Sequence, residues 1–546
     1  MMIGAMAMVK ALEAEGVGIV FGYPGANICP FYDCLAESSI RHVLVRNEQN
    51  AGHAASGYAR ISGKVGVCAA TSGPGATNLI TAIAAAYMDS IPIVAITGQV
   101  SSELLGRDAF QEADITGATL SVTKHRYLVK DARDLPRIFR EAFYIASTGR
   151  KGPVLIDVPI DVQLAKLDFC YPEEVHLRGY NPNIKGHAVQ VKRAADALAA
   201  CEKPLIVAGG GIFGAGAREP LRNFAETQKI PVICTMMGLS ALPPEHPLCL
   251  GMLGTFGTAL ANRALSESDL LIVAGARIGE RAMSSPGMVS KTKTIIHIDI
   301  DPAEIGKNMG TNIPIVGDLS LVLGQIAEAA VPADRSAWLA RTEELRSLFA
   351  ALPEDGEFDP VRFLHTLTKK MPPHGVLVAD VGQNQIWASE GFCAKTGRFL
   401  TSGGLGAMGY AIPAGIGAKL SAPEREVAVV CGDGSFQMAL PELATMMQEK
   451  APVKIIVMKN RCLGMIREIQ DQKYAGNRFA VELGDLPNLE KLAEAYDIEY
   501  MSICRNEETD AVVDAVLKAE HPVLVECAVP HDEPTLCFGG EGRERR

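Results

Sequence analysis

The sequence lacks any Cys-x-x-Cys pair, any long block of one charge and any unbroken apolar stretch long enough to span a membrane. Its thirteen cysteines are scattered and odd in number, which argues against a disulfide framework or a cysteine-based zinc site and indicates reduced thiols. The uncharged stretches 65–88 and 399–418 are interrupted by glycine and proline, so their backbone could not satisfy its own hydrogen bonds in lipid. We therefore expect no contact with a membrane.

The sequence also lacks a basic patch. Its 52 lysine and arginine residues are outnumbered by 63 aspartate and glutamate residues, so the net charge is −11 and the chain would repel a phosphate backbone. We therefore exclude nucleic acid as a partner. The first ten residues have no basic start and continue directly into a helical pattern, which predicts that there is no signal peptide and that the protein is cytoplasmic.

What the sequence does contain is a repeated alternation of two patterns. Short apolar runs rich in valine and isoleucine alternate with longer, alanine-rich stretches of helical period, and glycine or proline stands at the junctions. Several runs are apolar throughout, which is typical of strands buried on both faces of a parallel sheet. These patterns predict an α/β fold of doubly wound parallel sheets. The clearest expected strands are 42–46, 65–70, 91–97, 154–158, 205–208, 270–274, 295–300, 376–379, 427–431 and 454–458.

Two changes in composition predict where domains end. Residues 164–186 are polar, contain proline and show no periodicity, as expected of a connector. Residues 331–360 include a charged helical pattern at 341–348, which is then interrupted by a Pro-Glu-Asp-Gly sequence at 353–356. A chain of 546 residues is long enough for three or four domains. The two changes predict three, at 1–165, 185–335 and 360–530.

The strongest chemical signal follows two expected strands of the third domain. The strand 427–431 is followed by Gly-Asp-Gly-Ser, and the strand 454–458 is followed by Lys459 and Asn460. Asp433 and Asn460 are 27 positions apart, so we expect both at the carboxyl ends of neighbouring strands, where open α/β sheets bind ligands. A carboxylate and an amide oxygen suit Mg²⁺, and the glycines with the following helix suit a phosphate.

These residues also have a purely structural interpretation. Taken alone, a Gly-Asp-Gly tripeptide is more often an ordinary turn, and an Asn after a strand is more often a cap. The spacing and the strand context favour the metal site over this alternative.

Glu48 is the candidate functional residue of the first domain. It follows the expected strand 42–46 and precedes a stretch of small residues at 51–57, which permits close packing of a helix. A lone glutamate in this position is usually a solvated first-turn residue favoured by the helix dipole. From these residues alone, Glu48 can be interpreted either as a solvated first-turn residue or as a functional carboxylate.

Taken together, these residues resemble the signature of the thiamine-diphosphate (ThDP) enzymes, in which Gly-Asp-Gly is followed at a set interval by Asn. Further similarity covers nearly the whole chain and is closest to the catalytic subunits of the acetolactate synthase (acetohydroxyacid synthase) family. The stretches that carry this similarity are 23–25, 71–78, 108–112, 381–383, 401–404 and 463–465.

The resemblance implies a first domain that binds the pyrimidine ring of ThDP, a central FAD-type domain, and a third domain that binds the diphosphate and Mg²⁺. The metal ligands it implies are Asp433, Asn460 and the backbone carbonyl of Cys462. The implied contacts with ThDP are Tyr23, Pro24, Gly25, Glu48, Pro74, Asn78, Gln383, Asn384, Met408, Gly432, Gly434, Ser435, Gly464 and Met465.

The resemblance also implies the catalytic residues. Glu48 would be the catalytic carboxyl group, hydrogen-bonded to N1′ of the aminopyrimidine so that the 4′-amino group takes its imino form and can remove the C2 proton. Gln111 and Phe110 would border the reacting centre.

The middle domain contains a Gly-x-Gly-x-x-Gly sequence at 209–214, which nominally suggests NAD. The next expected strand, 230–235, ends in Cys-Thr and lacks the acidic residue that would bind the ribose, so NAD is disfavoured. The resemblance implies FAD instead, without a redox role. Arg281 would also meet the carboxylate of the second keto acid. Each matching side chain could equally form a surface ion pair. The matching residues are Arg150, Gly209, Gly211, Arg277, Arg281, Asp299 and Asp318.

Four features depart from the family pattern. Ile469 stands where a specificity tryptophan is expected, Ile160 replaces a lysine near the substrate channel, and Lys459 replaces the first residue of an Asn-Asn pair. The chain beyond 530–534 lacks the expected proline-rich capping segment. We therefore expect a wider and less discriminating acceptor pocket.

The resemblance implies a transferase of branched-chain amino-acid biosynthesis that decarboxylates pyruvate and condenses the enamine with a second 2-oxo acid to give 2-acetolactate. Each site would use Glu48 of one chain and Asp433 of another, which predicts a homodimer or homotetramer, with a regulatory small subunit as a further partner. One alternative is another ThDP-dependent 2-oxo-acid decarboxylase or lyase. A non-catalytic binding protein is disfavoured, because Glu48, Asp433 and Asn460 are all present.

Overall fold

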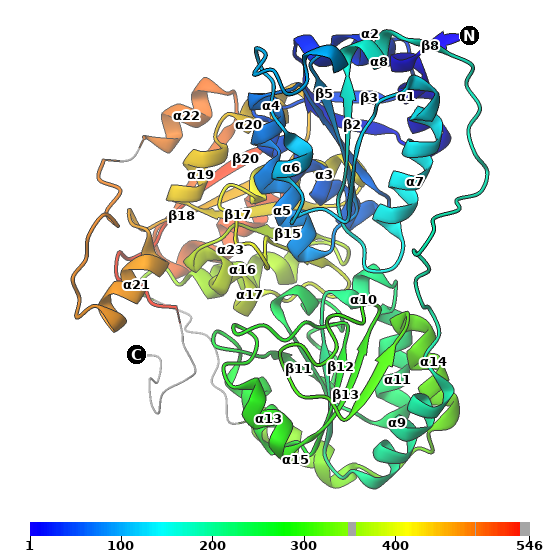
Figure 1. The fold of residues 1–546 in the computed structure, drawn as a ribbon. Helices are drawn as coiled ribbons and strands as arrows, with labels where there is room; N and C mark the ends of the chain where they lie inside the picture. Colours follow the sequence, from blue (N-terminus) through cyan, green and yellow to red (C-terminus); the bar gives the residue numbers. More distant parts are fainter. Residues whose placement is uncertain (348–355, 486, 536–546) are drawn as a thin grey trace.

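The computed structural model describes residues 1–347, 356–485 and 487–535, which form three α/β domains in chain order (Figure 1). Each domain contains a six-stranded sheet whose neighbouring strands are all parallel. The predicted α/β class with doubly wound parallel sheets is confirmed. The first and third domains lie side by side, and the middle domain lies below both. In the described part of the chain, no helix combines the length and apolar character needed to cross a bilayer.

The sheet of the first domain is covered on both faces. Its strands lie in the order β3 (Arg41–Leu44), β2 (Ile19–Tyr23), β4 (Gly66–Ala70), β5 (Ile93–Gln99), β7 (Val154–Pro159) and β6 (His125–Leu128). One face is covered by α1 (Gly4–Ala14), α2 (Cys29–Ala36) and α7 (Leu135–Ser147), and the other by α3 (Glu48–Ser62) and α5 (Ile80–Asp89). Shorter helices are α4 (Pro74–Asn78), α6 (Ile115–Ala118) and α8 (Ile160–Leu164).

The third domain repeats this plan. Its strands lie in the order β16 (Arg398–Leu400), β15 (Val376–Ala379), β17 (Val427–Gly432), β18 (Lys454–Lys459), β20 (Val523–Ala528) and β19 (Glu499–Ile503). One face is covered by α16 (Pro360–Lys370), α17 (Gln383–Gly391) and α23 (Thr509–Lys518). The other is covered by α18 (Ala411–Ser421), α19 (Asp433–Ala439), α20 (Glu442–Gln448) and α22 (Leu489–Ala495), and α21 (Gly464–Lys473) lies outside both layers.

The middle domain has a different strand order. Its strands are β11 (Cys249–Met252), β10 (Val232–Cys234), β9 (Pro204–Ala208), β12 (Leu270–Ala274), β13 (Thr294–Asp299) and β14 (Ile313–Val316). One face is covered by α9 (Ala188–Ala200), α11 (Arg218–Gln228) and α14 (Leu319–Ala329), and the other by α12 (Ala259–Glu267) and α15 (Ser336–Ser347). Two further helices are α10 (Gly211–Gly214) and α13 (Pro286–Thr292).

Apolar strands arise here because both faces of each sheet are buried. In β4, Val67 and Ala69 belong to one hydrophobic core, and Cys68 and Ala70 belong to the core on the opposite face. Since successive side chains of a strand point to opposite faces, a doubly covered strand has no position that favours a polar residue.

Each of the ten expected strands overlaps a strand of the structure, with differences at the ends. β3 ends at Leu44, two residues before the expected end, and β5 begins at Ile93, after Pro92. Five strands outside the expected ranges, β6, β11, β14, β16 and β19, are short and none of them is buried along its whole length. β2 and β20 were also not expected.

The expected connector 164–186 is largely without regular structure and runs along the side of the first domain to the middle domain (Figure 1). One difference is that Lys166 and Leu167 form a short strand, β8, antiparallel to β1 (Met2–Ile3). At the second expected boundary, α15 packs on the middle domain, where the indole of Trp338 donates to the carbonyl of Pro204. The expected break at 353–356 lies outside the described residues except for Gly356.

Strand order creates one crevice in each sheet. Numbered within each domain, the strands of the first and third domains follow the order 2-1-3-4-6-5, and those of the middle domain follow 3-2-1-4-5-6. The direction of winding reverses between β2 and β4, between β15 and β17, and between β9 and β12. Ligands bind to doubly wound sheets at the carboxyl ends of strands beside such a reversal.

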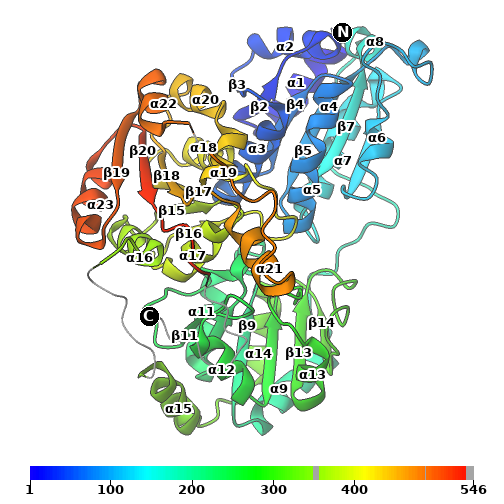
Figure 2. The same cartoon turned by 90° about the vertical axis from the view of Figure 1, so that its left-hand side faces the viewer.

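The first and third domains meet through α3 and α18, which lie side by side between the two sheets (Figure 2). A Cβ atom placed on Gly57 would lie 1.9 Å from the carbonyl oxygen of Ala414, and one on Gly417 would lie 1.9 Å from that of Ala54. The small residues at 51–57 therefore permit close packing, as the sequence predicts. The contact is reciprocal, and each of the two helices follows the second strand of its own domain.

Replacing Gly417 with alanine tests this contact. Because the added methyl group would meet a backbone carbonyl that cannot rotate away, we expect Gly417→Ala to destabilise the protein by about 2–3 kcal/mol. The matched control is Gly324→Ala, in an exposed turn of α14 with open space around it, which should stabilise by roughly 1 kcal/mol. Thermal unfolding of both variants measures the two effects, and equal midpoints would contradict the proposed close contact.

Candidate active site

The predicted metal ligands lie at the carboxyl ends of β17 and β18, beside the reversal between β15 and β17. β17 ends at Gly432 and is followed by Asp433, and β18 ends at Lys459 and is followed by Asn460. The two strands are parallel neighbours with Gly432 opposite Met458, so both side chains lie at the same edge of the sheet. Asp433 and Asn460 are both buried.

Asp433 is held by backbone donors. Its Oδ1 accepts a hydrogen bond from the amide of Gly434 at 2.8 Å, and its Oδ2 accepts one from the amide of Arg461 at 2.6 Å. Burial nevertheless raises the pKa of Asp433 to about 6. A cation beside this carboxylate would favour its charged form, so the position suits a bound metal ion.

Asn460 is oriented by Gln383. The Nδ2 of Asn460 donates to the Oε1 of Gln383 at 2.8 Å, while its Oδ1 accepts from the amide of Cys462 at 3.2 Å. Within the described residues, the carbonyl oxygen of Cys462 accepts no hydrogen bond. One carboxylate, one amide oxygen and one free carbonyl therefore lie at one edge of the sheet.

This donor set fits Mg²⁺ better than it fits a transition metal. The parts of the chain that the structure describes contain no cluster of three or more His, Cys, Asp or Glu that could hold a metal ion. Magnesium accepts oxygen ligands and is commonly held by one or two carboxylates while phosphate groups and water complete its shell. The three oxygens at this edge are consistent with that arrangement.

The loops around Asp433 place the other predicted residues of the third domain at the same edge. Ser435 donates to the carbonyl of Gly432, and the Cε of Met408 lies 3.8 Å from the Cβ position of Gly434. A Cβ on Gly464 would lie 1.8 Å from the Oε1 of Gln383, so a larger residue at this helix start would displace the side chain that orients Asn460. Asn384 and Met465 lie in the first turns of α17 and α21, beside Gln383 and Gly464.

Asp380 is a structural residue of this site that sequence reasoning missed. It follows β15 and is buried, and its carboxylate accepts hydrogen bonds from the amides of Val381, Gly409 and Ala411 at 2.8–3.0 Å. Burial raises its pKa to about 6. Its contacts fix the loop that carries Met408. The signal in the sequence that could have pointed to Asp380 is a lone aspartate directly after the apolar run 376–379.

The predicted residues of the first domain gather around its own reversal. Glu48 begins α3, and its Oε2 accepts from the Nδ2 of Asn78 at 2.9 Å, while the Cβ position of Gly75 lies 3.2 Å from its Oε1. Pro74 begins α4, which ends at Asn78. Tyr23 ends β2 and is 41% exposed, and Pro24 and Gly25 follow it at the same edge.

Gln111 and Phe110 lie in a loop after β5. Gln111 has a positive φ of 59°, and its backbone atoms lie 2.8–3.0 Å from the Cβ position of Gly73, which itself has a φ of 59°. The loop therefore rests directly on the turn before Pro74. Phe110 is 88% exposed, and its ring takes part in no aromatic pair among the described residues.

Glu442 links the third domain to the residues on either side of Glu48. It is fully buried in α20 of the third domain, and its Oε1 accepts from the amide of Arg46 at 2.8 Å and from the Nδ2 of Asn50 at 3.0 Å. These two donors flank Glu48 on either side. Over the described chain, however, no hydrogen bond or ion pair joins the residues around Glu48 directly to those around Asp433.

In the middle domain, the structure gives the glycine-rich sequence a packing role. A Cβ on Gly209 would lie 2.2 Å from the carbonyl oxygen of Gly275, and one on Gly211 would lie 2.8 Å from the Cα of Gly275. The loops after β9 and β12 thus touch at the reversal point of this sheet. The helix that follows, α10, spans only Gly211–Gly214, and β10 is followed by Thr235. The short α10 and the missing acidic residue after β10 therefore disfavour an NAD-binding motif, as the sequence does.

The other candidate FAD residues are distributed around that edge. Arg150 pairs with Glu304 at 2.7 Å and with Asp301 at 3.2 Å, and Arg281 is exposed with its guanidinium 5.8 Å from the ring of Phe256. The guanidinium of Arg277 lies beside Gly404. Burial raises the pKa of Asp299 to about 6. The carboxylate of Asp318 caps α14.

Three of the four departures from the family pattern lie near the third-domain site. Lys459 pairs with Glu526 at 2.7 Å, and Ile469 lies partly buried in α21. The segment 530–534 packs over the site, because the Nε2 of Gln383 donates to the carbonyl of Glu533 and the indole of Trp387 donates to that of Pro534. Ile160 begins α8 in the first domain. Residues 536–546 lie outside the described residues.

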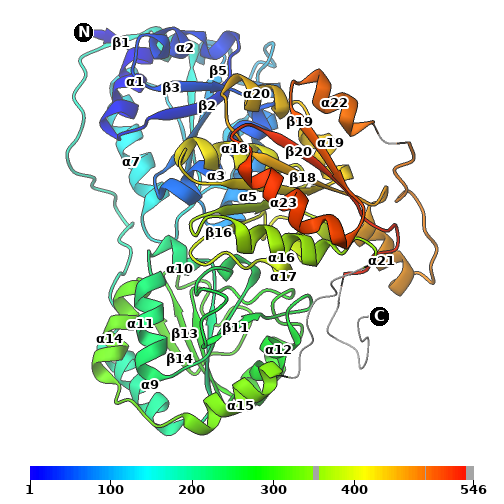
Figure 3. The same cartoon turned by 180° about the vertical axis from the view of Figure 1, so that it is seen from behind.

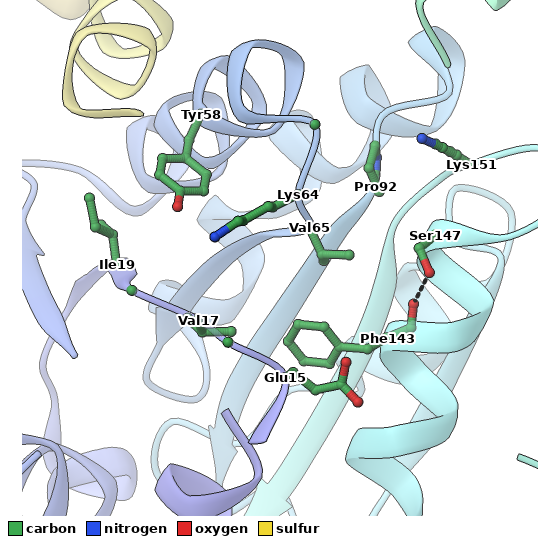
Figure 4. Close-up of a pocket in the computed structure, with 13 residues that line it drawn as sticks. Glu15, Val17, Ile19, Tyr58, Lys64, Val65, Pro92, Phe143, Ser147 and Lys151 are labelled. Carbon is green, nitrogen blue, oxygen red and sulfur yellow. Dashed lines mark hydrogen bonds between the residues drawn. The ribbon is translucent and has the colours of Figure 1, made fainter. Parts of the chain in front are cut away.

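A separate pocket of about 200 Å³ lies at the opposite edge of the first sheet (Figure 4). Its lining includes Val17, Lys64, Val65 and Pro92, which lie before or near the amino ends of β2, β4 and β5. Glu48 and Asn78 are at the carboxyl ends, so this pocket is distinct from the candidate active site.

Comparison with known proteins agrees with this geometry. Three family models match the chain: the N-terminal TPP (thiamine pyrophosphate, or ThDP) binding domain of thiamine pyrophosphate enzymes over residues 2–118, the central domain over 191–326, and the C-terminal TPP binding domain over 380–527. The probable acetolactate synthase large subunit of Methanocaldococcus jannaschii is 45% identical, over 98% of this chain and 94% of its own length. The chain belongs to the acetolactate synthase large-subunit family of thiamine pyrophosphate enzymes.

Two bacterial members of the family are similar to a comparable degree. The acetolactate synthase large subunit of Corynebacterium glutamicum is 45% identical over 97% of this chain and 87% of its own length. That of Mycobacterium tuberculosis is 44% identical over 97% of this chain and 88% of its own length. The resemblance found in the sequence is confirmed, and this member of the family is a ThDP-dependent enzyme that requires Mg²⁺.

Proposed function

We propose that this chain converts two molecules of pyruvate into 2-acetolactate and CO₂. The observation that carries the proposal is the match to acetolactate synthase large subunits over nearly the full chain, together with the oxygen ligands at the reversal between β15 and β17. When bound, ThDP supplies the carbon nucleophile and the electron sink for decarboxylation. The chain binds the reactants, orients them and keeps water away.

In this proposal the third domain holds the diphosphate and Mg²⁺. Asp433, Asn460 and the carbonyl of Cys462 bind the metal ion, and Gln383 keeps the amide oxygen of Asn460 available by accepting from its Nδ2. The glycines beside Asp433 allow the backbone to approach a phosphate, because no side chain intervenes. The proposed diphosphate and thiazole contacts are Gln383, Asn384, Met408, Gly432, Gly434, Ser435, Gly464 and Met465.

The first domain supplies the acid–base group in this proposal. The carboxyl of Glu48 holds a proton at N1′ of the pyrimidine, and the hydrogen bond from Asn78 fixes its orientation. Tyr23, Pro24, Gly25, Pro74 and Asn78 border the pyrimidine site. Gln111 and Phe110 border the reacting centre.

We propose that a complete site needs two chains. The support is that, in the described chain, no hydrogen bond or ion pair joins the Glu48 and Asp433 groups, and that Phe110 is 88% exposed. A two-fold pairing would bring Glu48 of one chain to Asp433 of another, which requires a homodimer or a homotetramer. Because several relatives are named large subunits, we also propose a regulatory small subunit as a partner. A cytoplasmic location is part of the same proposal.

We propose the domain limits 1–165, 185–335 and 360–530, with α15 attached to the middle domain. The three sheets and the connector after Leu167 support these limits. The middle domain is proposed to bind FAD through Arg150, Gly209, Gly211, Arg277, Arg281, Asp299 and Asp318.

A second candidate function is a ThDP-dependent decarboxylase or lyase. The observation that favours it is Ile469, which is smaller than the tryptophan expected there and leaves the acceptor pocket wider.

Product analysis distinguishes these functions. Protein incubated with ThDP, Mg²⁺ and pyruvate should form acetolactate and CO₂, measured by chromatography. With equal pyruvate and 2-oxobutyrate, we expect comparable amounts of the two products, since no tryptophan favours the larger acceptor. Acetaldehyde as the sole product would contradict the proposal and support the decarboxylase.

Replacing Glu48 with glutamine tests the proton at N1′. We expect Glu48→Gln to lower kcat by about 100- to 10,000-fold because the amide cannot hold that proton, while ThDP still binds. The matched control is Glu37→Gln, an exposed residue of the same domain, which should keep wild-type turnover. Turnover and ThDP affinity are measured on both variants, and unchanged turnover in Glu48→Gln would remove Glu48 from the mechanism.

Flavin content tests the proposed role of the middle domain. Purified protein should show the absorbance bands of bound flavin, or take up one FAD per chain on titration. Arg277→Gln should weaken that uptake, because it removes the guanidinium beside Gly404 at the domain junction. Absence of any flavin binding would leave this domain as a scaffold.

A further inference from the structure

An arginine cluster lies where the three domains meet. Arg398 begins β16 in the third domain and interacts electrostatically with the guanidinium groups of Arg60, Arg218 and Arg425. Arg60 lies in α3 of the first domain, Arg218 begins α11 of the middle domain, and Arg425 precedes β17. We call these four residues the arginine cluster.

The ring of Phe213 brings two of these cations together. The guanidinium carbon of Arg398 lies 3.7 Å from the centre of the Phe213 ring, and that of Arg218 lies 5.9 Å from the same ring. Phe213 belongs to α10, which lies next to β16 (Figure 3). The third and middle domains therefore meet through two cations that share one aromatic ring.

The cluster has little counter-charge of its own. Within the described residues, the Arg398 side chain makes no hydrogen bond or ion pair, and its Nε is buried without a partner. Arg218 donates to the carbonyl of Thr396, and Arg60 donates to neutral oxygens of the third domain. Arg425 has one ion pair, at 3.9 Å, with its exposed neighbour Glu424.

Two acidic groups act on other members of the cluster, but neither acts on Arg398. Asp89 attracts Arg60, and its carboxylate also accepts hydrogen bonds from the amides of Gly403 and Gly404. Glu219 attracts Arg218 but pairs with Arg222 at 2.6 Å. Burial and the three neighbouring cations hold the pKa of Arg398 well below its usual range.

Arg398 is buried beside three other cations and, within the described residues, has no acidic partner of its own, which is costly for a charged group, so its position calls for an anion. Guanidinium groups present several N–H donors in a plane and match phosphate oxygens better than other side chains do. We propose that the arginine cluster binds a small phosphate-bearing anion. Arg398 and Arg425 lie at the amino ends of β16 and β17, opposite the edge that carries Asp433, so this site is separate from that proposed for the ThDP diphosphate.

Two ligands could supply this phosphate chemistry: free inorganic phosphate and the diphosphate of FAD.

Equilibrium dialysis tests the proposal. The full-length protein, saturated with ThDP and Mg²⁺ to fill the catalytic site, is dialysed against labelled inorganic phosphate at constant ionic strength set with chloride. We expect saturable binding of one phosphate per chain. Arg398→Gln should weaken it at least tenfold. The control Arg178→Gln, at an exposed arginine of the connector, should leave it unchanged.

A second arm adds saturating FAD. Phosphate binding that persists with FAD identifies a free anion as the ligand. Displacement of phosphate by FAD, with FAD binding weakened by Arg398→Gln, identifies the flavin diphosphate. Either outcome supports the arginine cluster as an anion site. No saturable binding, or binding of phosphate and FAD that Arg398→Gln leaves unchanged, would overturn the proposal.

Thermal unfolding keeps the proposal testable if Arg398→Gln also affects folding. In chloride alone, the variant should unfold at or above the wild-type temperature, since removing one cation relieves repulsion. Phosphate should raise the midpoint of the wild type and not that of the variant. A variant that is destabilised equally in chloride and in phosphate would show that Arg398 is only a packing residue, against the proposal. Because these readouts measure binding and stability, they are independent of whether acetolactate is formed.

Discussion

The close contact between α3 and α18 is the constraint on which the rest of the structure depends. It brings the backbones of the first and third domains together through Gly57 and Gly417, with carbonyl groups facing each glycine. Glu48 begins α3, so the position of this carboxyl group is set by the same contact. Glu442 strengthens the arrangement by accepting hydrogen bonds from both sides of Glu48. The candidate catalytic carboxyl is therefore fixed by packing between domains as well as within its own.

Local sequence was sufficient to predict the fold class and the position of the metal-binding edge. Strands such as β12 and β17 are apolar along nearly their whole length because helices cover both faces. That pattern can be recognised in the sequence without the tertiary structure. Asp433 and Asn460 could be placed together because parallel strands present their carboxyl ends at one edge. Short edge strands such as β16 escaped prediction, because half-buried segments of three or four residues have no distinctive period.

The supporting residues of the site could not be predicted in the same way. Asp380 accepts three backbone amides from two loops, and Glu442 reaches residues almost 400 positions away in the sequence. Neither belongs to a local motif, since their partners are defined only by the folded chain. The arginine cluster has the same origin, because its members come from three domains that a linear pattern does not relate.

The reciprocity of the α3–α18 contact restricts how this junction can vary. Ala54 faces Gly417 and Ala414 faces Gly57, so each helix presents the same small-residue spacing to the other, as identical subunits do across a two-fold axis. In an ordinary core, a larger side chain on one helix can be accommodated by a smaller one opposite. Here the opposing atom is a carbonyl oxygen that every amino acid carries, so no second substitution can make room, and both glycines must be retained together.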